Sequence, residues 1–249
     1  MTRVKLRIAV DVDDTLYHNA VVPDFLDEFG IPRFVQESWD FNFPEMTPEN
    51  KAKLMTRFVD PKYMCFLQPN PGSDVVNDWK AEGHTLTCVT MRRPKIDAET
   101  IEMVNRDFPG VFDGVVMCNP ERETYGSRDK NTELVAGKYD VYIDDSGEYI
   151  LAAYKAGVVK YCFLMSNENT PHNKAAVREI EAAHARGEMV SVHVVSSWAE
   201  IKLPNVFKGG FIQPDIRSHN PSRIYLSPSE FFEYGRRPTK VIKPLVPAE

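Results

Sequence analysis

The sequence predicts an α/β fold of three layers, in which a parallel sheet lies between two layers of helices, with a small helical insertion. Short apolar runs alternate with amphipathic stretches along most of the chain, which is typical of a parallel sheet with crossover helices. Acidic residues directly follow two of these runs. The 249 residues are enough for one buried core with an inserted subdomain.

The first predicted strand covers residues 6–12. The pattern then changes, because residues 18–69 are rich in aromatic residues and prolines. This segment has short helical patterns at 23–29 and 48–58, and we expect no strong strand within it. We therefore predict a small, mostly helical insertion between the first strand and the rest of the sheet.

Strands and helices alternate again from residue 70. Further strands are predicted at 84–90, 114–118, 139–143, 158–164 and 189–195. Helices are predicted at 74–82, 97–106, 131–136, 147–156 and 170–186, with a short one at 197–201. The predicted core thus comprises residues 1–17 and 70–203, and residues 18–69 form the insertion.

Residues 204–249 form a proline-rich segment with few periodic patterns. We expect an extended C-terminal arm that packs over its own core rather than an independent domain. An arm that binds a second copy of the chain, giving a homo-oligomer, or an anionic polymer end is the alternative.

Composition excludes several classes of function. No apolar run approaches the roughly 18 residues that a membrane span needs, and the N-terminus lacks an apolar signal region. The four cysteines are widely spaced, which favours buried reduced thiols in a cytoplasmic protein over a zinc site. The net charge of -6 argues against general nucleic-acid binding. We expect a cytoplasmic protein without a membrane partner.

Two predicted strands end in carboxylates, which are costly to bury unless they are paired or bind a metal. Asp11, Asp13 and Asp14 end the first strand, and Asp144 and Asp145 end the strand at 139–143. If the two strands are neighbours, these acids converge where open α/β sheets bind ligands. A cluster of oxygens suits a hard cation, and Mg²⁺ in particular. Each acid alone could instead cap the following helix.

Four segments in this order resemble the signatures of the haloacid dehalogenase (HAD) superfamily of phosphohydrolases. They are the D-x-D-x-T run Asp11-Val12-Asp13-Asp14-Thr15, an apolar strand ending in Thr90, a lysine at Lys130, and an apolar strand ending in Asp144-Asp145. The resemblance covers roughly residues 4 to 165. It implies a Rossmann-like HAD core, with residues 18–69 as a helical cap over the site.

The resemblance implies a division of catalytic roles. Asp11 would be the nucleophile that forms an aspartyl-phosphate, and Asp13 would protonate the leaving oxygen and then activate water. Thr90 and Lys130 would bind phosphoryl oxygens. Lys138 is the alternative lysine, but it lies at the entry to the strand, far from the acids. The acid at Asp13 favours a phosphate ester or anhydride over halide displacement.

The resemblance also implies a Mg²⁺ site. Its ligands would be Asp11, the backbone carbonyl of Asp13 and the paired acids Asp144 and Asp145. Of the paired acids we favour Asp145 as the direct ligand.

The layout further resembles the 5'(3')-deoxyribonucleotidase branch, on the residues at 67–72, 128–130 and 143–145. This implies a 5'-nucleotidase acting on (deoxy)nucleoside monophosphates. Trp39, Phe41 and Phe43 alternate within the insertion and could stack on a nucleobase, or else form the insertion's own core. The alternatives are a phosphatase of sugar phosphates or of 3'-phosphorylated nucleic-acid ends, and an inactive HAD-fold binding protein.

Overall fold

The structure is a computed structural model that describes residues 4–32, 46–118, 130–166 and 171–204. The chain divides into two units, one of residues 5–202 and one that combines residues 1–4 with 203–249. Almost all of the second unit lies outside the described residues, and so does the predicted arm after its first residue. The fold and the site below belong to the first unit.

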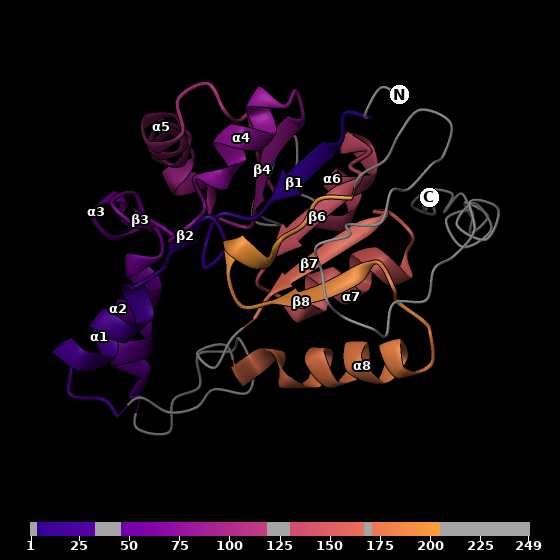
Figure 1. Cartoon of the computed structure of the whole chain (residues 1–249). Helices are drawn as coiled ribbons and strands as arrows, with labels where there is room; N and C mark the ends of the chain where they lie inside the picture. Colours follow the sequence, from indigo (N-terminus) through magenta and orange to yellow (C-terminus); the bar gives the residue numbers. More distant parts are fainter. Residues whose placement is uncertain (1–3, 33–45, 119–129, 167–170, 205–249) are drawn as a thin grey trace, which may run out of the picture. The chain divides into compact units, whose positions relative to one another are not determined.

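Six parallel strands form the central sheet in the spatial order β5-β4-β1-β6-β7-β8 (Figure 1). The first strand of the chain lies in the middle, and its neighbours are the strands that carry Thr90 and Asp144. The strands are β1 (Arg7–Val10), β4 (Thr85–Thr90), β5 (Gly114–Met117), β6 (Val141–Asp144), β7 (Tyr161–Met165) and β8 (Val192–Val195). The four inner strands β1, β4, β6 and β7 are mostly buried, as strands covered on both faces should be, whereas the edge strands β5 and β8 are partly exposed.

Helices flank both faces of this sheet. The core helices are α4 (Val75–Ala81), α5 (Asp97–Asp107), α6 (Lys130–Gly137), α7 (Gly147–Lys155) and α8 (Lys174–Ala185). Strand order reverses beside β1, so right-handed crossovers place α4 and α5 on one face and α6, α7 and α8 on the other. The fold class predicted from the sequence is therefore confirmed: a three-layer, Rossmann-like α/β fold.

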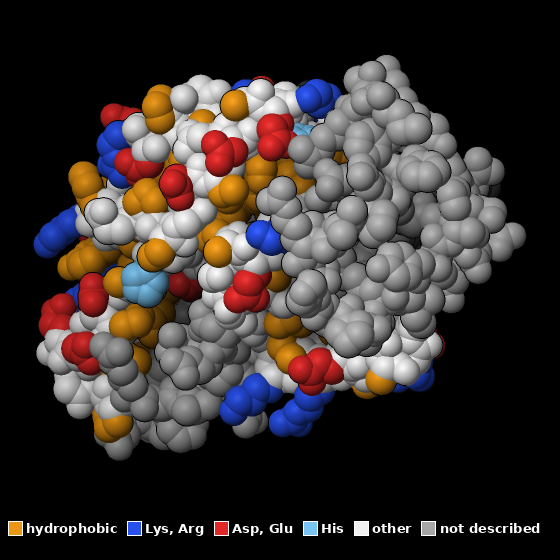
Figure 2. Space-filling model, viewed as in Figure 1, with side chains coloured by type: hydrophobic (Ala, Val, Ile, Leu, Met, Phe, Trp, Pro, Cys, Tyr) orange, Lys and Arg blue, Asp and Glu red, His pale blue; other side chains and the backbone are white. Residues whose placement is uncertain are grey.

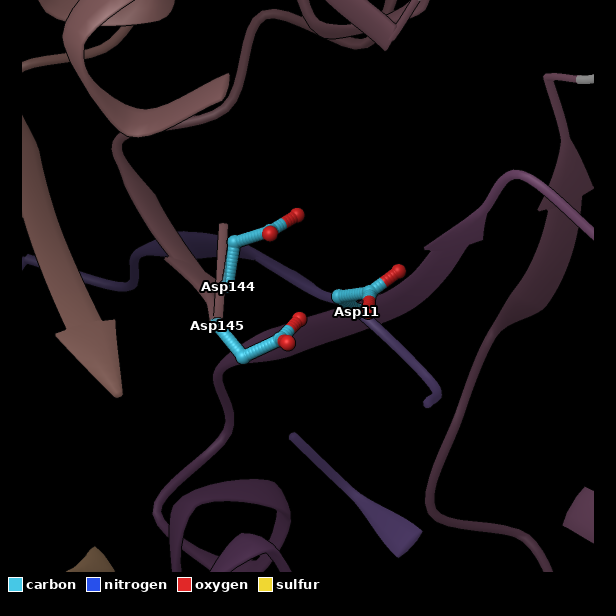
Figure 3. Close-up of side chains that lie close together, drawn as sticks. All are labelled: Asp11, Asp144 and Asp145. Carbon is cyan, nitrogen blue, oxygen red and sulfur yellow. The ribbon is translucent and has the colours of Figure 1, made fainter. Parts of the chain in front are cut away.

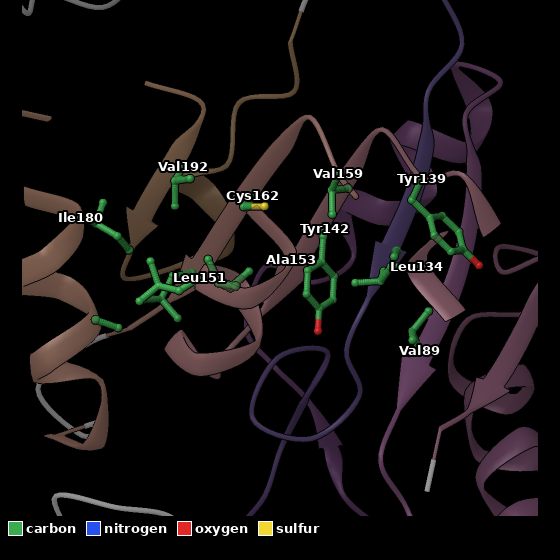
Figure 4. Packing of buried hydrophobic residues seen from close by; sticks show 14 of the residues in the cluster. Val89, Leu134, Tyr139, Tyr142, Leu151, Ala153, Val159, Cys162, Ile180 and Val192 are labelled. Carbon is green, nitrogen blue, oxygen red and sulfur yellow. The ribbon is translucent and has the colours of Figure 1, made fainter. Parts of the chain in front are cut away.

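The core on the α6–α8 face shows how the three helices are held. Leu134, Leu151 and Ile180, one from each helix, pack in one buried cluster with Tyr142 and Cys162 of the sheet (Figure 4). Burying side chains of this size stabilises the fold by about 1.5–3 kcal/mol each. On the strands, alternate residues point to this cluster, as the period of two requires.

Every predicted strand and core helix has a counterpart, with boundaries that differ by a few residues. The last strand begins at Val192 rather than 189, because Met189 has a left-handed backbone (φ 48°) that starts a turn. The helix predicted from residue 170 begins as a 3-10 turn at Pro171–Asn173 before α8. The 197–201 segment is also a 3-10 turn, at Trp198–Glu200.

Between β1 and β4 the described part of the insertion contains three helices, as expected. They are α1 (Val21–Glu28), α2 (Pro48–Arg57) and α3 (Pro61–Met64). Thr47 caps α2 by accepting a hydrogen bond from the Asn50 amide. Arg57 of α2 binds Glu28 of α1 at 2.6 Å and lies over the Phe25 ring.

Two short strands at the ends of the insertion were not predicted. Two short strands, β2 (Tyr17–His18) and β3 (Gln68–Pro69), pair antiparallel where the chain leaves and rejoins the core. Two residues are too few for a periodic pattern, so the sequence carried no signal for them. This two-stranded pairing brings both ends of the insertion together.

Two further observations concern the surface and the thiols. Among the described residues, no helix is long and apolar enough to cross a bilayer. On the described part of the face in Figure 2, acidic and basic side chains are interspersed. All four cysteines, Cys65, Cys88, Cys118 and Cys162, are free and buried, as predicted.

Candidate active site

The candidate site lies at the carboxyl ends of three adjacent strands. Thr90 is the last residue of β4, Asp11 directly follows β1, and Asp144 is the last residue of β6. The Asp11 amide donates a hydrogen bond to the carbonyl of Ile143 at 2.9 Å, which fixes the register between β1 and β6. Strand order reverses here, and open α/β sheets bind ligands at such a switch point.

Three carboxylates meet at this point, from Asp11, Asp144 and Asp145 (Figure 3). One oxygen of each lies within 4.8 Å of the others, and all three residues are buried. The ammonium of Lys130, at the start of α6, binds Asp11 Oδ1 at 2.6 Å and Asp144 Oδ2 at 2.7 Å. The alternative lysine, Lys138, is exposed before the entry of β6.

The two paired acids differ in what they bind. Asp144 accepts hydrogen bonds from Lys130, from the Tyr142 hydroxyl and from the Ser146 amide at 2.7 Å. Asp145 Oδ1 accepts a long hydrogen bond of 3.5 Å from the Thr15 hydroxyl. Asp145 Oδ2 is buried and has no hydrogen-bond partner among the described residues. A buried oxygen without a partner is costly unless a ligand fills the gap.

Burial sets the electrostatics of these acids. It raises the pKa of the Asp11 carboxyl to about 8, with Asp144 and Asp13 adding to the rise and Lys130 opposing it. Burial, together with the charge of Asp144, also raises the pKa of Asp145 well above its usual range. For Lys130, burial alone would lower the pKa, but the contacts with Asp11 and Asp144 raise it. The ammonium therefore stays charged between the two carboxylates.

This donor set fits a divalent cation. Among the described residues, three buried carboxylates face one ammonium, so two negative charges lack a counter-charge there when all three acids are ionised. Carboxylate oxygens are the ligands that hard cations prefer. The oxygen of Asp145 without a partner points to the ligand position. Asp11, Asp144 and Asp145 could thus hold a metal ion.

The second acid of the first motif has a different environment. Asp13 accepts hydrogen bonds from Arg92 Nε at 2.9 Å and Nη2 at 2.8 Å, through both of its oxygens. Its side chain is 26% exposed, whereas that of Arg92 is 2% exposed. Asp14 adopts a left-handed backbone (φ 54°), and its carboxylate accepts the Asn19 amide at 3.2 Å. Asp14 thus closes the turn.

Two side chains from distant segments fasten the loop after β1. The carbonyl of Thr15 accepts hydrogen bonds from Asn70 Nδ2 at 2.8 Å and from Trp198 Nε1 at 3.0 Å. Asn173 does the same for the loop after β6, since it donates to the Asp145 carbonyl at 2.6 Å and accepts the Gly147 amide at 2.9 Å. In both loops, side chains from distant segments bind backbone groups and so fix the path of the loop.

Sequence reasoning anticipated only part of this arrangement. The structure brings together Asp11, Lys130, Asp144 and Asp145, with Thr90 on the adjacent strand end, and places Asp13 two residues along the same loop. Trp39, Phe41 and Phe43 lie outside the described residues.

Three residues that hold the loops and side chains of the candidate site were not predicted from the sequence. Arg92, two residues after a strand end, carried a weak signal as a charged residue beside an apolar run. Asn173 and Trp198 carried none, because their contacts span 28 and 183 residues of chain.

Comparison with known proteins gives no family match. No protein-family model and no curated protein matches the chain.

Among solved structures, the chain is similar to a haloacid dehalogenase-like hydrolase of Streptococcus pneumoniae (13% identity, TM-score 0.49, covering 79% of this chain and 96% of that one). It is also similar to a Clostridium difficile protein assigned as a phosphatase (13%, 0.48, 79% and 96%). A HAD-superfamily hydrolase of Ehrlichia chaffeensis matches at 11% identity and a TM-score of 0.39, over 72% and 98% of the two chains.

Proposed function

We propose that this chain is a Mg²⁺-dependent phosphomonoester hydrolase of the HAD superfamily that forms an aspartyl-phosphate at Asp11. One observation carries the proposal: three buried carboxylates and one lysine converge at the carboxyl ends of adjacent strands, and an oxygen of Asp145 has no hydrogen-bond partner within the described ranges. The sequence motif D-x-D-x-T at residues 11–15 supports the same assignment.

The reaction has two displacements. In the first, a carboxylate oxygen of Asp11 attacks phosphorus, the ester P–O bond breaks, and Asp13 gives its proton to the leaving oxygen. In the second, water attacks the phosphorus of the acyl-phosphate and gives a proton to Asp13. The bond between phosphorus and the Asp11 oxygen then breaks, which releases orthophosphate and restores both carboxyl groups.

The other residues bind and orient the phosphoryl group. Lys130 and Thr90 would contact its oxygens and offset the charge that develops in the transition state. Asp11, the Asp13 carbonyl and Asp145 would hold Mg²⁺, and Asp144 would chiefly hold Lys130, because its oxygens already accept three hydrogen bonds. A bound Mg²⁺ supplies Lewis-acid stabilisation of the phosphoryl oxygens.

For the substrate we propose a nucleoside monophosphate, cleaved as by a 5'-nucleotidase and including deoxynucleotides. The support is the sequence resemblance to the deoxyribonucleotidase branch and the aromatic run Trp39, Phe41 and Phe43. The rival substrates stay as before: sugar phosphates and 3'-phosphorylated nucleic-acid ends. Cytoplasmic location and self-association through residues 204–249 also stay predictions.

The test is Mg²⁺-dependent phosphate release over a panel of nucleotides, sugar phosphates and 3'-phosphorylated oligonucleotides. We expect Asp11→Asn to lose at least about 10⁴-fold in kcat, as nucleophile removal does in other covalent enzymes. Asp78→Asn, on an exposed position of α4, is the matched control and should equal wild type. Equal activity of Asp11→Asn and wild type would remove the mechanism. No phosphate release by the wild type on any member of the panel would leave the inactive binding protein.

The same panel tests the substrate class. A nucleotidase should prefer nucleotides, and Trp39→Ala or Phe41→Ala should remove that preference while activity on p-nitrophenyl phosphate persists. Indifference of the wild-type enzyme to the base would reject the nucleotide assignment and leave the phosphatase assignment in place.

A further inference from the structure

Arg92 is buried beside the candidate site, and within the described residues it donates no hydrogen bond to Asp11, Asp144 or Asp145. Instead its guanidinium forms a bidentate pair with Asp13, with N–O distances of 2.9 and 2.8 Å. Two parallel bonds fix both the position and the plane of a carboxylate, which a single contact cannot do. The pair joins segments that are 79 residues apart in the chain.

The guanidinium is itself held from a third segment. Its Nη1 donates to Thr100 Oγ1 on α5 at 3.2 Å, and the Thr100 hydroxyl donates to the Ile96 carbonyl at 2.6 Å. The Arg92 backbone amide donates to Thr90 Oγ1 at 3.3 Å. Thr100 is fully buried, so this support is rigid. Arg92 thus links the helix α5, the strand end at Thr90 and the carboxylate of Asp13.

Stability alone does not explain this arrangement. Burying a guanidinium is costly, and an ion pair with one partly exposed partner returns little of that cost. Asp13 is 26% exposed, whereas Arg92 is 2% exposed. An apolar side chain at position 92 would fill the same space without the desolvation penalty. The placement is better explained by what it does to Asp13.

We propose that Arg92 is a positioning residue that holds the Asp13 carboxyl toward the leaving oxygen, and so enables substrates whose leaving group needs a proton. This inference rests on the proposed function. The bidentate pair uses one lone pair of each Asp13 oxygen, and Oδ1 also accepts a hydrogen bond from Asn19 Nδ2 at 3.4 Å. The partly exposed side chain keeps the second lone pair of Oδ2 for substrate and water. Misplacement of a reacting group by about 1 Å can cost 10²-fold in rate.

The test compares phosphate monoesters that differ in leaving group. An alkyl ester such as glycerol phosphate needs a proton on the departing oxygen, whereas p-nitrophenolate leaves without one. We expect Arg92→Met to lower kcat/KM for the alkyl ester by about 10²-fold and for p-nitrophenyl phosphate by less than about 3-fold. Arg92→Lys keeps the charge but not the planar fork and should fall between Arg92→Met and wild type.

A double-mutant cycle separates positioning from a structural role. In an Asp13→Asn background, Arg92→Met should cost less than about 2-fold, because a residue that acts only through Asp13 has nothing left to position. Thr100→Val, which removes the hydroxyl that orients Arg92, should shift leaving-group dependence in the same direction by a smaller factor. If Arg92→Met does not fold, Thr100→Val serves as the test variant in its place. Arg106→Met, whose guanidinium pairs with Asp107, is the control and should match wild type on every ester.

Three outcomes would overturn the inference. An equal loss on all esters indicates a structural role, and additive losses in the Asp13→Asn background indicate that Arg92 acts elsewhere. Either result leaves the proposed phosphatase function standing, provided that the wild-type enzyme hydrolyses the esters with Mg²⁺. If wild type hydrolyses none of them, the proposed function fails and the role of Arg92 fails with it.

Discussion

The two sides of the loop after β1 differ in how they balance charge. On the β6 side, defined by Lys130, Asp144 and Asp145, the buried acids around Asp11 outnumber the one buried cation in the described part of the chain. On the β4 side, defined by Thr90 and Arg92, one guanidinium faces one carboxylate that remains partly exposed. The first side has a deficit of positive charge that a metal ion would fill. The second pairs one cation with one acid, and the acid stays partly open to solvent.

The largest expected contrast is in stability without metal. Lys130→Met should lower the free energy of unfolding by about 3–5 kcal/mol, because it leaves Asp11 and Asp144 as buried acids without their cation. Arg92→Met should cost less than about 1 kcal/mol, because water can solvate the partly exposed Asp13. Urea unfolding in the presence of a chelator measures both. Equal losses would show that the two sides do not differ in the way described.

A second contrast separates the paired acids on the β6 side. Asp145→Asn should weaken Mg²⁺ binding by on the order of 100-fold, because it alters the carboxylate whose Oδ2 has no hydrogen-bond partner among the described residues. Asp144→Asn should weaken it by about 10-fold, through loss of its hold on Lys130. Calorimetric titration of the metal-free protein with Mg²⁺ gives both values. The reverse order would make Asp144 the direct ligand.

The third prediction concerns pH. Burial raises the pKa of Asp11 from 3.8 to about 8 and that of Asp145 well above its usual range. A raised pKa in the folded state stabilises the protein below the unfolded-state pKa, and this contribution is lost as the pH rises through the folded-state pKa. The metal-free protein should therefore lose stability between about pH 4 and pH 8, by about 1.4 kcal/mol per pKa unit shifted.

Added Mg²⁺ competes with protons for the same oxygens, so it should raise the melting temperature more at pH 8 than at pH 5. Thermal melts with and without Mg²⁺ measure this difference. Asp145→Asn should reduce both the pH slope and the Mg²⁺ effect. A metal-free stability that is flat over this range would contradict the charge imbalance on the β6 side.

The smallest expected effect is that of Asn173→Ala. Loss of the two backbone hydrogen bonds loosens the Asp145 turn, so Mg²⁺ affinity should fall by about 10-fold while the site keeps all its ligands. The matched control is Asn77→Ala. Asn77 is exposed, and its side-chain amide donates a hydrogen bond to the nearby Asp74 carbonyl. Unchanged Mg²⁺ affinity in calorimetry would limit Asn173 to a role in folding.

The acids were predictable because of how a parallel sheet is built. Asp11 and Asp144 each follow an apolar run, and parallel strands end at one edge, so their convergence needs only that β1 and β6 be neighbours. Lys130 was predictable over Lys138 because a helix must begin beside the site and return to the far edge.

The rest depends on loop paths that no local pattern encodes. Arg92 reaches Asp13 only because the chain after β4 turns back over the loop after β1. Asn173 reaches the Asp145 carbonyl from beyond the next strand. Such contacts are set by tertiary packing, and neither residue type nor spacing along the chain specifies the partner.

The bond from Trp198 to the Thr15 carbonyl also has a consequence for biosynthesis. It spans 183 residues, so the loop that bears Asp11 leaves the ribosome well before Trp198 and lacks this hydrogen bond until Trp198 has followed. During translation the loop can be closed by Asn70 alone. A nascent chain stopped before Trp198 would carry the acids of the first motif without this hydrogen bond, so the loop after β1 is fully fastened only after Trp198 has been synthesised.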